Sequence, residues 1–241
     1  MIKEHSYCKP PDNPNIMIWK YLDFTKFIDL LTSKKLYFSR FDKFDDIFEG
    51  SLPRKSVLAR TDQLKYFGVE DNTELLSDEF WDKIGLDLKQ KFAASCWHMN
   101  NHESTAMWKV YLKTNEGVAI QSTYNRLYNC LNETKDPIYL SVVHYKDFET
   151  ETIHWGNRMV PFVHKRISYG FEQELRAIIK SDDGYDLDKG GYKVGININK
   201  LIENIFIAPA APIWFTELVK TLVADLKINV WNSKLDDKPL Y

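Results

Sequence analysis

The spacing of apolar positions predicts a strand, an amphipathic helix and a second strand near the start of the chain. A strand pattern begins at Ile16, after a lead-in over residues 1–15 that contains three prolines and no regular period. Over residues 24–31, apolar side chains recur at steps of three and four, which is typical of an amphipathic helix, and Asp23 stands where an N-cap is needed. Residues 35–40 again favour a strand.

The rest of the chain mixes helical and strand-like patterns without strict alternation. Residues 52–90 are polar with a helical period, interrupted at Gly68 and Gly85, and predict a helical insertion after the second strand. Helical patterns also cover residues 104–112 and 215–226. Strand-like segments are expected at residues 92–97, 117–123, 138–145, 171–180, 192–198 and 205–208. This mixture predicts an α+β fold in which helices flank a central mixed β-sheet, within a single domain over residues 1–241.

Composition argues against nucleic acid and membranes as partners of the protein. The 241 residues include 32 Lys and Arg and 34 Asp and Glu, for a formal net charge of −2. This balance gives no general attraction for phosphate backbones, so nucleic acid is not an expected partner. The most apolar stretch, residues 205–215, is shorter than the roughly 20 residues of a membrane span. Three widely spaced cysteines favour reduced thiols. With no secretory signal pattern, we expect a cytoplasmic protein without membrane association.

Sequence motifs for common cofactors and metals are missing. The chain contains neither GxGxxG nor GxxxxGK[ST], so Rossmann and P-loop nucleotide sites are not expected. His102 and Glu103 begin an HExxH-like phrase, but Ala106 stands at the second ligand position, and no metal site is predicted. His98 and His102 are therefore expected to be solvated or hydrogen-bonded.

The acidic run SDDGYDLDKGG, at residues 181–191, does not have the spacing of an EF-hand calcium loop. It lies between two strand patterns. We therefore expect a solvated hairpin loop in which Gly184, Gly190 and Gly191 take positive φ.

Glu172 and Glu174 are the side chains with the clearest chemical content. In a strand over residues 171–180, residues two apart share one face at about 6–7 Å, so the two carboxylates would lie side by side with Arg176. Neighbouring carboxylates raise each other's pKa and can divide the tasks of orienting a nucleophile and stabilising a developing cation. The alternative is a solvated strand face on which Arg176 and Lys180 balance the acids.

Arg40 follows two expected core positions, Leu36 and Phe38, at the end of the second predicted strand. Its planar guanidinium suits a phosphate or a carboxylate, so it either binds an anionic ligand or is paired in place. The next residues interleave aromatic with acidic side chains, which indicates an acidic loop held down by rings. The acids that could pair with Arg40 are Asp45, Asp46 and Glu49.

Trp108 and Tyr111 are neighbours at helical spacing, next to Met107 and Val110. A core stripe is the simpler interpretation. The alternative is an aromatic wall for a planar ligand, because stacking requires such rings beside a cleft.

Several phrases between Ile18 and Leu235 occur in a defined order. They are LLTSKKLYFSRFDKFDDIFEG, an SCW turn followed by MWKVYLKTNEGVAI, then FEQELRAII, and finally IENIFIAPAAP with VWNSKL. In this order they resemble the bacterial domain-of-unknown-function family 2971. The resemblance implies a bacterial protein and is consistent with the predicted fold, but the family name records no activity.

A second resemblance, to ADP-ribosyltransferases of the Arg-Ser-Glu type, rests on Arg40, Ser95 and the triplet at residues 172–174, in that order. It implies NAD as the substrate. Arg40 would hold the NAD phosphates, and Ser95 would support the ribose pocket. Glu174 would bind a ribose hydroxyl and stabilise an oxocarbenium-like transition state, while Glu172 would orient the acceptor. Trp108 or Tyr111 would stack on the nicotinamide.

Three functions follow from these alternatives. The first is an NAD-using transferase or glycohydrolase of ADP-ribosyltransferase type, acting in bacterial defence or stress. The second is a non-enzymatic ligand-sensing or protein-interaction domain with a structural network of charges. The third is metal-dependent hydrolysis of nucleic acid by Asp45, Asp46, Glu172 and Glu174, which lacks the basic surroundings that such chemistry needs. The sequence gives no indication of the oligomeric state.

Overall fold

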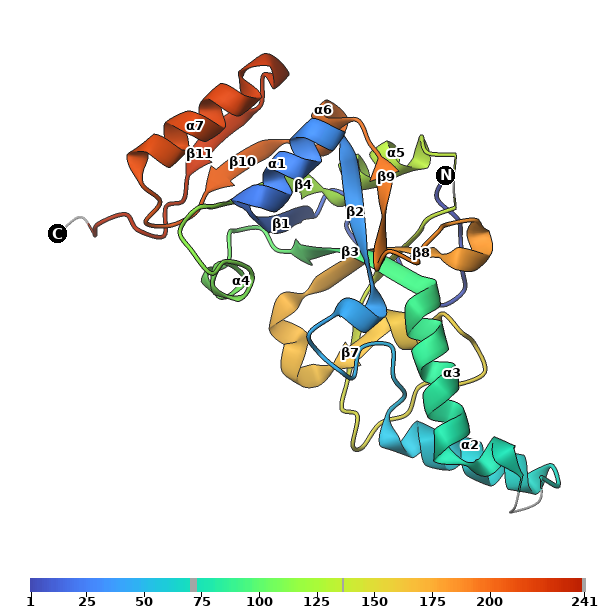
Figure 1. Ribbon diagram of the computed structural model, residues 1–241. Helices are drawn as coiled ribbons and strands as arrows, with labels where there is room; N and C mark the ends of the chain where they lie inside the picture. Colours follow the sequence, from blue (N-terminus) through green and yellow to red (C-terminus); the bar gives the residue numbers. More distant parts are fainter. Residues whose placement is uncertain (70–72, 136, 240–241) are drawn as a thin grey trace.

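The computed structural model describes residues 1–69, 73–135 and 137–239. In this part of the chain, helices flank a mixed sheet of nine strands, and β6 and β7 form a separate parallel pair (Figure 1). The predicted α+β fold with a central mixed sheet is therefore confirmed. Residues 70–72 of the predicted insertion, residue 136 and residues 240–241 lie outside the described part.

The elements of the described residues are numbered in chain order. The strands are β1 (Met17–Asp23), β2 (Lys35–Arg40), β3 (Phe92–Met99), β4 (Gly117–Thr123), β5 (Tyr139–Val142), β6 (His144–Lys146), β7 (His164–Arg166), β8 (Glu174–Lys180), β9 (Gly191–Gly195), β10 (Asn204–Ile207) and β11 (Asn229–Asn232). The α-helices are α1 (Phe24–Ser33), α2 (Arg54–Tyr66), α3 (Asp78–Lys91), α4 (Thr105–Tyr111), α5 (Tyr124–Asn132), α6 (Ile198–Leu201) and α7 (Ile213–Val223). Two of the 3₁₀ helices, η3 (Val160–Val163) and η4 (Ile167–Glu172), border β7.

The sheet forks at β3. β8 pairs with β3 along residues 92–98 and so occupies one edge of that strand. The opposite edge is shared, because β1 pairs with residues 98–99 whereas β2 pairs with residues 93–94. Neither β1 nor β2 pairs with residues 95–97, so the two strands diverge there. The middle of β3 is left with an open edge, beside the helix α1 that connects β1 to β2.

The first strand, helix and second strand form where the sequence predicts them. The side chain of Asp23 accepts a hydrogen bond of 2.8 Å from the backbone N–H of Lys26, which confirms Asp23 as the N-cap of α1. The helix ends at Lys34, whose φ of 52° lies in the left-handed region. Phe27 and Leu30 are buried on its inner face.

The helical insertion after β2 is confirmed over its described residues. It consists of α2 and α3, which extend together away from the sheet in Figure 1. Gly68 does interrupt the helical pattern, since it follows the end of α2 with φ of 84°. Gly85 does not, because it lies inside α3. Ser56 anchors α2 by donating a hydrogen bond to the Ile153 carbonyl and accepting one from the Ile153 N–H, at 3.0 and 2.7 Å.

Two predictions around β8 are wrong. The strand begins at Glu174 rather than at residue 171, because Glu172 belongs to the 3₁₀ helix η4 and Gln173 takes a left-handed φ of 39°. Residues 181–191 do not form a hairpin, because β8 pairs with β3 and β5 whereas β9 pairs with β2. Gly184 and Gly190 take the predicted positive φ, but Gly191 lies in β9, where a Cβ would approach the Phe38 carbonyl oxygen to 2.3 Å.

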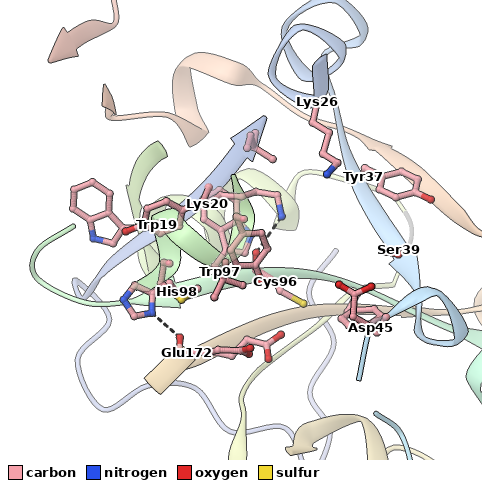
Figure 2. Close-up of a pocket in the computed structure, with 18 of the residues that line it drawn as sticks. Trp19, Lys20, Lys26, Tyr37, Ser39, Asp45, Cys96, Trp97, His98 and Glu172 are labelled. Atoms are coloured by element: carbon pink, nitrogen blue, oxygen red, sulfur yellow. Dashed lines mark hydrogen bonds between the residues drawn. The ribbon is translucent and has the colours of Figure 1, made fainter. Parts of the chain in front are cut away.

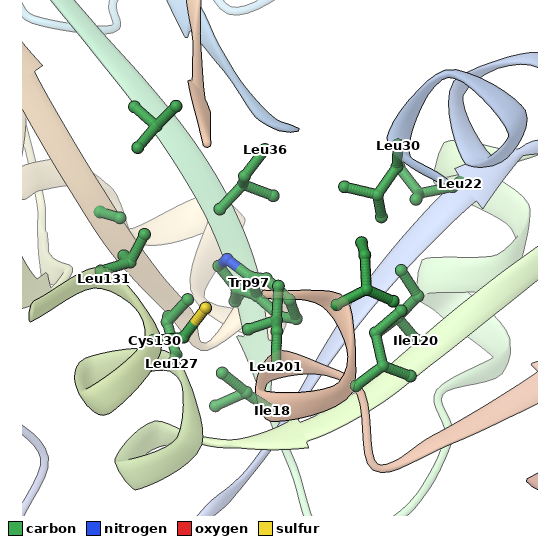
Figure 3. Close-up of a cluster of buried hydrophobic side chains, with 14 of the residues drawn as sticks. Ile18, Leu22, Leu30, Leu36, Trp97, Ile120, Leu127, Cys130, Leu131 and Leu201 are labelled. Atoms are coloured by element: carbon green, nitrogen blue, oxygen red, sulfur yellow. The ribbon is translucent and has the colours of Figure 1, made fainter. Parts of the chain in front are cut away.

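The main core lies under the sheet around Trp97, which leucine and isoleucine side chains from several elements surround (Figure 3). A second cluster contains Phe41, Phe92 and Phe162, and a third contains Trp19, Tyr21 and Trp108. Burial of these apolar surfaces supplies the main favourable free energy of folding. In the part of the chain that the structure describes, no helix has the length and apolar character that crossing a bilayer requires.

Candidate functional site

A cavity of about 860 Å³ lies in the fork of the sheet, where β1 and β2 diverge from β3. Figure 2 shows Cys96, Trp97 and His98 of β3 between Lys20 on one side and Glu172 on the other. Residues of α1, of α4 and of the loop after β2 complete the lining. The cavity is within the range of about 300–1,000 Å³ that is typical of small-molecule sites.

Five buried charged residues lie together at the base of this cavity, and we call them the charged cluster. They are Glu49, Lys165, Glu172, Glu174 and Arg176. All except Arg176 line the cavity. The predicted solvated strand face is therefore wrong: Glu174 is 4% exposed and Arg176 is fully buried.

Arg176 holds two of the carboxylates. Its Nε and Nη2 donate to the two carboxylate oxygens of Glu174, each at 2.9 Å, and Nη2 also donates to Glu49 at 2.8 Å. Nη1 donates to the Phe162 carbonyl oxygen at 2.9 Å. Such bidentate, charge-assisted contacts fix the carboxylate of Glu174 in one orientation.

Lys165 links the remaining carboxylate to the charged cluster. Its Nζ lies 2.6 Å from Glu172, 2.9 Å from Glu49 and 3.7 Å from Glu174. Three carboxylates therefore face two cations, and full ionisation of the charged cluster would leave one net negative charge. Burial first, and then this excess of negative charge, raise the pKa of one of the acids, Glu172.

The two acids of the EQE triplet differ in pKa. Burial alone would raise the pKa of Glu174, but the charge and hydrogen bonds of Arg176, together with the charge of Lys165, hold it at about 2. Burial raises the pKa of Glu172 above its ordinary value, against the opposing charge of Lys165. Near neutral pH Glu174 is thus a fixed anion, whereas Glu172 is the acid that exchanges a proton more easily.

Glu49 reaches the charged cluster because the loop after β2 is tightly held. Phe41 stacks on Phe44 with ring centroids 4.8 Å apart, so the predicted anchoring by rings is confirmed at these residues. Gly50 follows with φ of 68°, and a Cβ there would lie 2.5 Å from a ring carbon of Phe162. Asp46 is paired with Arg166 at 2.6 Å.

Lys20 occupies the open edge of β3. Its Nζ donates to Ser95 Oγ and to the Cys96 carbonyl oxygen, both at 3.1 Å, and thereby bonds to a strand edge that neither β1 nor β2 reaches. No carboxylate lies within 4.0 Å of this ammonium in the described residues. Burial lowers the pKa of Lys20 to about 8, against the charges of Cys96 and Glu174.

His98 is a polar side chain of β3 in the cavity lining. Its Nδ1 lies 2.6 Å from the Glu172 carbonyl oxygen, which confirms the expected hydrogen-bonded state. Its Nε2 is buried without a partner among the described residues. Burial lowers the pKa of His98, so the neutral imidazole is favoured. With the proton on Nδ1, Nε2 carries a free lone pair.

Of the two residues of the predicted aromatic wall, Tyr111 lines the cavity and Trp108 belongs to the core. Tyr111 lines the cavity, and burial followed by the charges of Cys96 and Glu174 raises its pKa. Trp108 is 4% exposed, packs edge-to-face on Tyr21 at 4.9 Å and donates from Nε1 to Glu103. For Trp108 the core interpretation is thus the one that the structure bears out.

Arg40 and Ser95 do not line the cavity. Arg40 is paired with Asp42 through Nε and Nη2, at 2.5 and 2.8 Å, and Nη1 donates to the Leu187 carbonyl oxygen. The interpretation that Arg40 is paired in place is thus confirmed, but its partner is Asp42 and not Asp45, Asp46 or Glu49. Ser95 is 1% exposed and accepts a hydrogen bond from Lys20. Neither side chain is placed to contact a ligand held in the cavity.

The mouth of the cavity is mainly basic. Six exposed charged residues line it, and five of them are lysines. They are Lys26, Lys35, Lys43, Lys113 and Lys193, with Asp45. An anionic group that approaches from solvent therefore meets positive charge before it reaches the charged cluster.

Several of these residues were not predicted from the sequence. Lys20 gives the clearest signal, as a single cation within the apolar strand MIWKYLD. Lys165 gives none, since HKR follows an apolar segment without any visible spacing to the glutamates. No group of three or more His, Cys, Asp or Glu side chains in the described ranges is arranged to hold a metal ion.

Comparison of the chain with protein-family models, curated proteins and solved structures finds no match. Neither resemblance noted from the sequence is tested by this result, and both stay predictions.

Proposed function

We propose that the cavity in the fork binds NAD and that the protein cleaves the bond between nicotinamide and ribose, as a transferase or glycohydrolase of ADP-ribosyltransferase type. One observation carries the proposal: two buried carboxylates line the same cavity but are held by different cations, Glu172 by Lys165 at 2.6 Å and Glu174 by Arg176 at 2.9 Å. In keeping with these contacts, their pKa values move in opposite directions. Pairs of acids separated in this way are typical of sites that combine a fixed charge with proton transfer.

The chemistry follows from these two states. When the C–N bond breaks, its electron pair leaves with nicotinamide, and the ribose becomes oxocarbenium-like. The ionised carboxylate of Glu174 would stabilise this positive charge. Glu172 would accept the proton of the water or acceptor hydroxyl whose oxygen forms the new bond to the ribose carbon. The resemblance to Arg-Ser-Glu enzymes implies the same role for Glu174, and for Glu172 it implies that the carboxylate orients the acceptor.

The rest of the cavity suits the other parts of NAD. In place of Arg40, we assign phosphate binding to Lys20 and to the lysines at the mouth, Lys26 and Lys113. Ammonium groups are common ligands of phosphate. Tyr111, rather than Trp108, would stack on the nicotinamide ring.

The experiment is to incubate the protein with NAD and to measure nicotinamide release by chromatography, with and without added protein acceptors. We expect wild-type turnover, and a loss of about 10²–10⁴-fold in Glu172→Gln, the range for removal of a general base. Glu174→Gln should lose at least as much. Glu217→Gln, whose side chain is 65% exposed, is the matched control and should keep full activity. Absence of release from the wild-type protein under all these conditions would contradict the proposal.

A second candidate, a non-enzymatic ligand-sensing domain, is favoured by one contact. Arg176 engages both carboxylate oxygens of Glu174, so the charge of this carboxylate is already met within a structural network. Calorimetric titration with NAD separates the two candidates. Binding without nicotinamide release, weakened by Lys20→Met, would support the sensing domain.

A further inference from the structure

A second cavity, of about 690 Å³, lies between the helical insertion and the segment after β6 and shares no lining residue with the cavity in the fork. It is lined by residues of α2 and α3, by residues 50–52 and by residues 155–158 with Pro161. The function proposed for the fork makes no use of it. Its most unusual member is Arg60 of α2, which is 4% exposed.

Arg60 is a buried cation without a bonded partner. In the part of the chain that the structure describes, its guanidinium forms no salt bridge within 4.0 Å, and its Nε has no hydrogen-bond partner. Arginine is rarely buried unless paired, and an unsatisfied buried donor requires an explanation such as a bound ligand or ion.

The contacts of Arg60 show which kind of hydrogen-bond acceptor its guanidinium could take. The guanidinium carbon lies 4.0 Å from the centre of the Trp81 ring, so one face of the guanidinium is already stacked. Asp78 and Asp82 line the same cavity and favour the charged form of Arg60, but both are exposed to solvent and neither pairs with it. The N–H groups at the edge of the guanidinium can therefore donate to an acceptor on a bound ligand.

The other residues of the cavity indicate what kind of molecule would accompany the acceptor. Trp155 stands edge-on to Trp81 with ring centroids 6.3 Å apart, and both indoles line the cavity. Arg158 and Lys89 add two further cations to the lining. The volume is far larger than a single anion needs and matches that of a small organic molecule.

We infer that this cavity is a second ligand site, which binds a small molecule carrying an oxyanion on a flat ring. The oxyanion accepts hydrogen bonds from the free edge of Arg60, and the ring lies against Trp155. A phosphate and a carboxylate offer the same acceptor geometry to arginine.

The test measures the melting temperature of the full chain with four probes. AMP and indole-3-carboxylate supply the two oxyanions, and adenosine and indole are their uncharged counterparts. At about five times its Kd, a ligand should raise Tm by about 2–4 °C in a protein of this size. We expect this shift from at least one of the oxyanions and not from its counterpart, and which of them acts distinguishes a phosphate from a carboxylate ligand.

Arg60→Met should abolish the shift, whereas Arg54→Met, at an exposed position of the same helix, should leave it unchanged. Should the methionine variant not fold, Arg60→Lys keeps the charge without the planar fork and should weaken binding about tenfold. Lys20→Met removes the phosphate ligand proposed for the fork and should not alter the shift, which separates this site from the fork. No shift with either oxyanion, or a shift that survives both changes at Arg60, would overturn the inference.

Discussion

Two buried arginines in the same chain have opposite surroundings. Arg176 is fully buried, and each of its guanidinium nitrogens donates to an acceptor from β8, from the loop after β2 or from η3. Arg60 is 4% exposed, stacks on Trp81 and donates to no residue in the described ranges. Burial of a guanidinium therefore does not itself indicate structure or function: what matters is whether the chain supplies the counter-charge.

The difference between the partners of Arg176 and Arg60 shows how the fork is organised. The bonds of Arg176 tie three segments that are distant in sequence to the base of one cavity, and they hold Glu174 as an anion. Arg60 ties nothing together, because its nearest acids remain in solvent. The first arginine is part of the frame of a site, and the second is available to a ligand.

The largest effect is expected from Arg176→Met, which leaves Glu49 and Glu174 buried without their main counter-charge. Breaking a buried ion pair in this way typically destabilises by about 3–5 kcal/mol. Urea unfolding should show this loss in the free energy of unfolding. Arg60→Met, at the other arginine, should change it by less than about 1 kcal/mol, since no ion pair is lost. Equal losses at the two positions would break the comparison.

Lowering the pH should lower the free energy of unfolding, because the Glu174 carboxylate becomes protonated. A carboxylate whose folded pKa is depressed stabilises the fold above its unfolded pKa, and this stabilisation is lost as the pH falls toward the folded value. For Glu174 the interval runs from its unfolded value of 4.5 down to about 2. Wild-type and Glu174→Gln proteins should therefore differ in stability at pH 6 and converge near pH 2. A constant difference across that interval would show that the carboxylate is not held in the charged form.

A smaller effect is expected from Gly50→Ala, which disturbs the placement of Glu49 beside Arg176. The substitution combines a strained positive φ with a clash against Phe162, and we expect a loss of about 2–4 kcal/mol. Gly184→Ala is the matched control, because its φ is also positive, at 94°, but no atom lies within 4 Å of the added Cβ. It should lose about 1–2 kcal/mol by strain alone. Equal melting temperatures of the two variants would mean that the Phe162 ring moves aside without a cost in stability.

The smallest effect is expected at a surface pair. Lys26 and Asp23 lie 2.8 Å apart, but the lysine side chain is 68% exposed. Lys26→Met should lower the free energy of unfolding by no more than about 0.5 kcal/mol, because solvent screens the attraction. A loss as large as that of Arg176→Met would contradict the view that burial sets the strength of the charged cluster.

The periodic patterns were sufficient to predict much of the fold. β2, β4, α1 with its Asp23 cap, and the described part of the insertion lie where spacing and capping predict them. The hairpin over residues 181–191 failed because strand pairing is decided by distant partners, here β2 for β9 and β3 for β8. Helix α5 was not predicted, although Thr123 caps it and its apolar face is well defined.

The candidate site could be predicted only in part. Glu172, Glu174 and Tyr111 were found from local spacing, and they do line one cavity. For Arg40 the sequence left ligand binding and pairing in place open, and the structure shows a pair with Asp42, which was not among the partners expected. The fork itself depends on how three strands share the two edges of β3, and with it the positions of Lys20 and Lys165. No single segment of the sequence contains that information.

The central claim is that Glu172 and Glu174 share a cavity but hold their protons differently. Carbon-13 NMR of the side-chain carboxyl groups across a pH titration measures this directly, with Glu172→Gln and Glu174→Gln assigning the two signals. We predict that Glu174 titrates near pH 2 and Glu172 above its unfolded value of 4.5. Two signals that titrate together near the ordinary glutamate pKa would contradict the account.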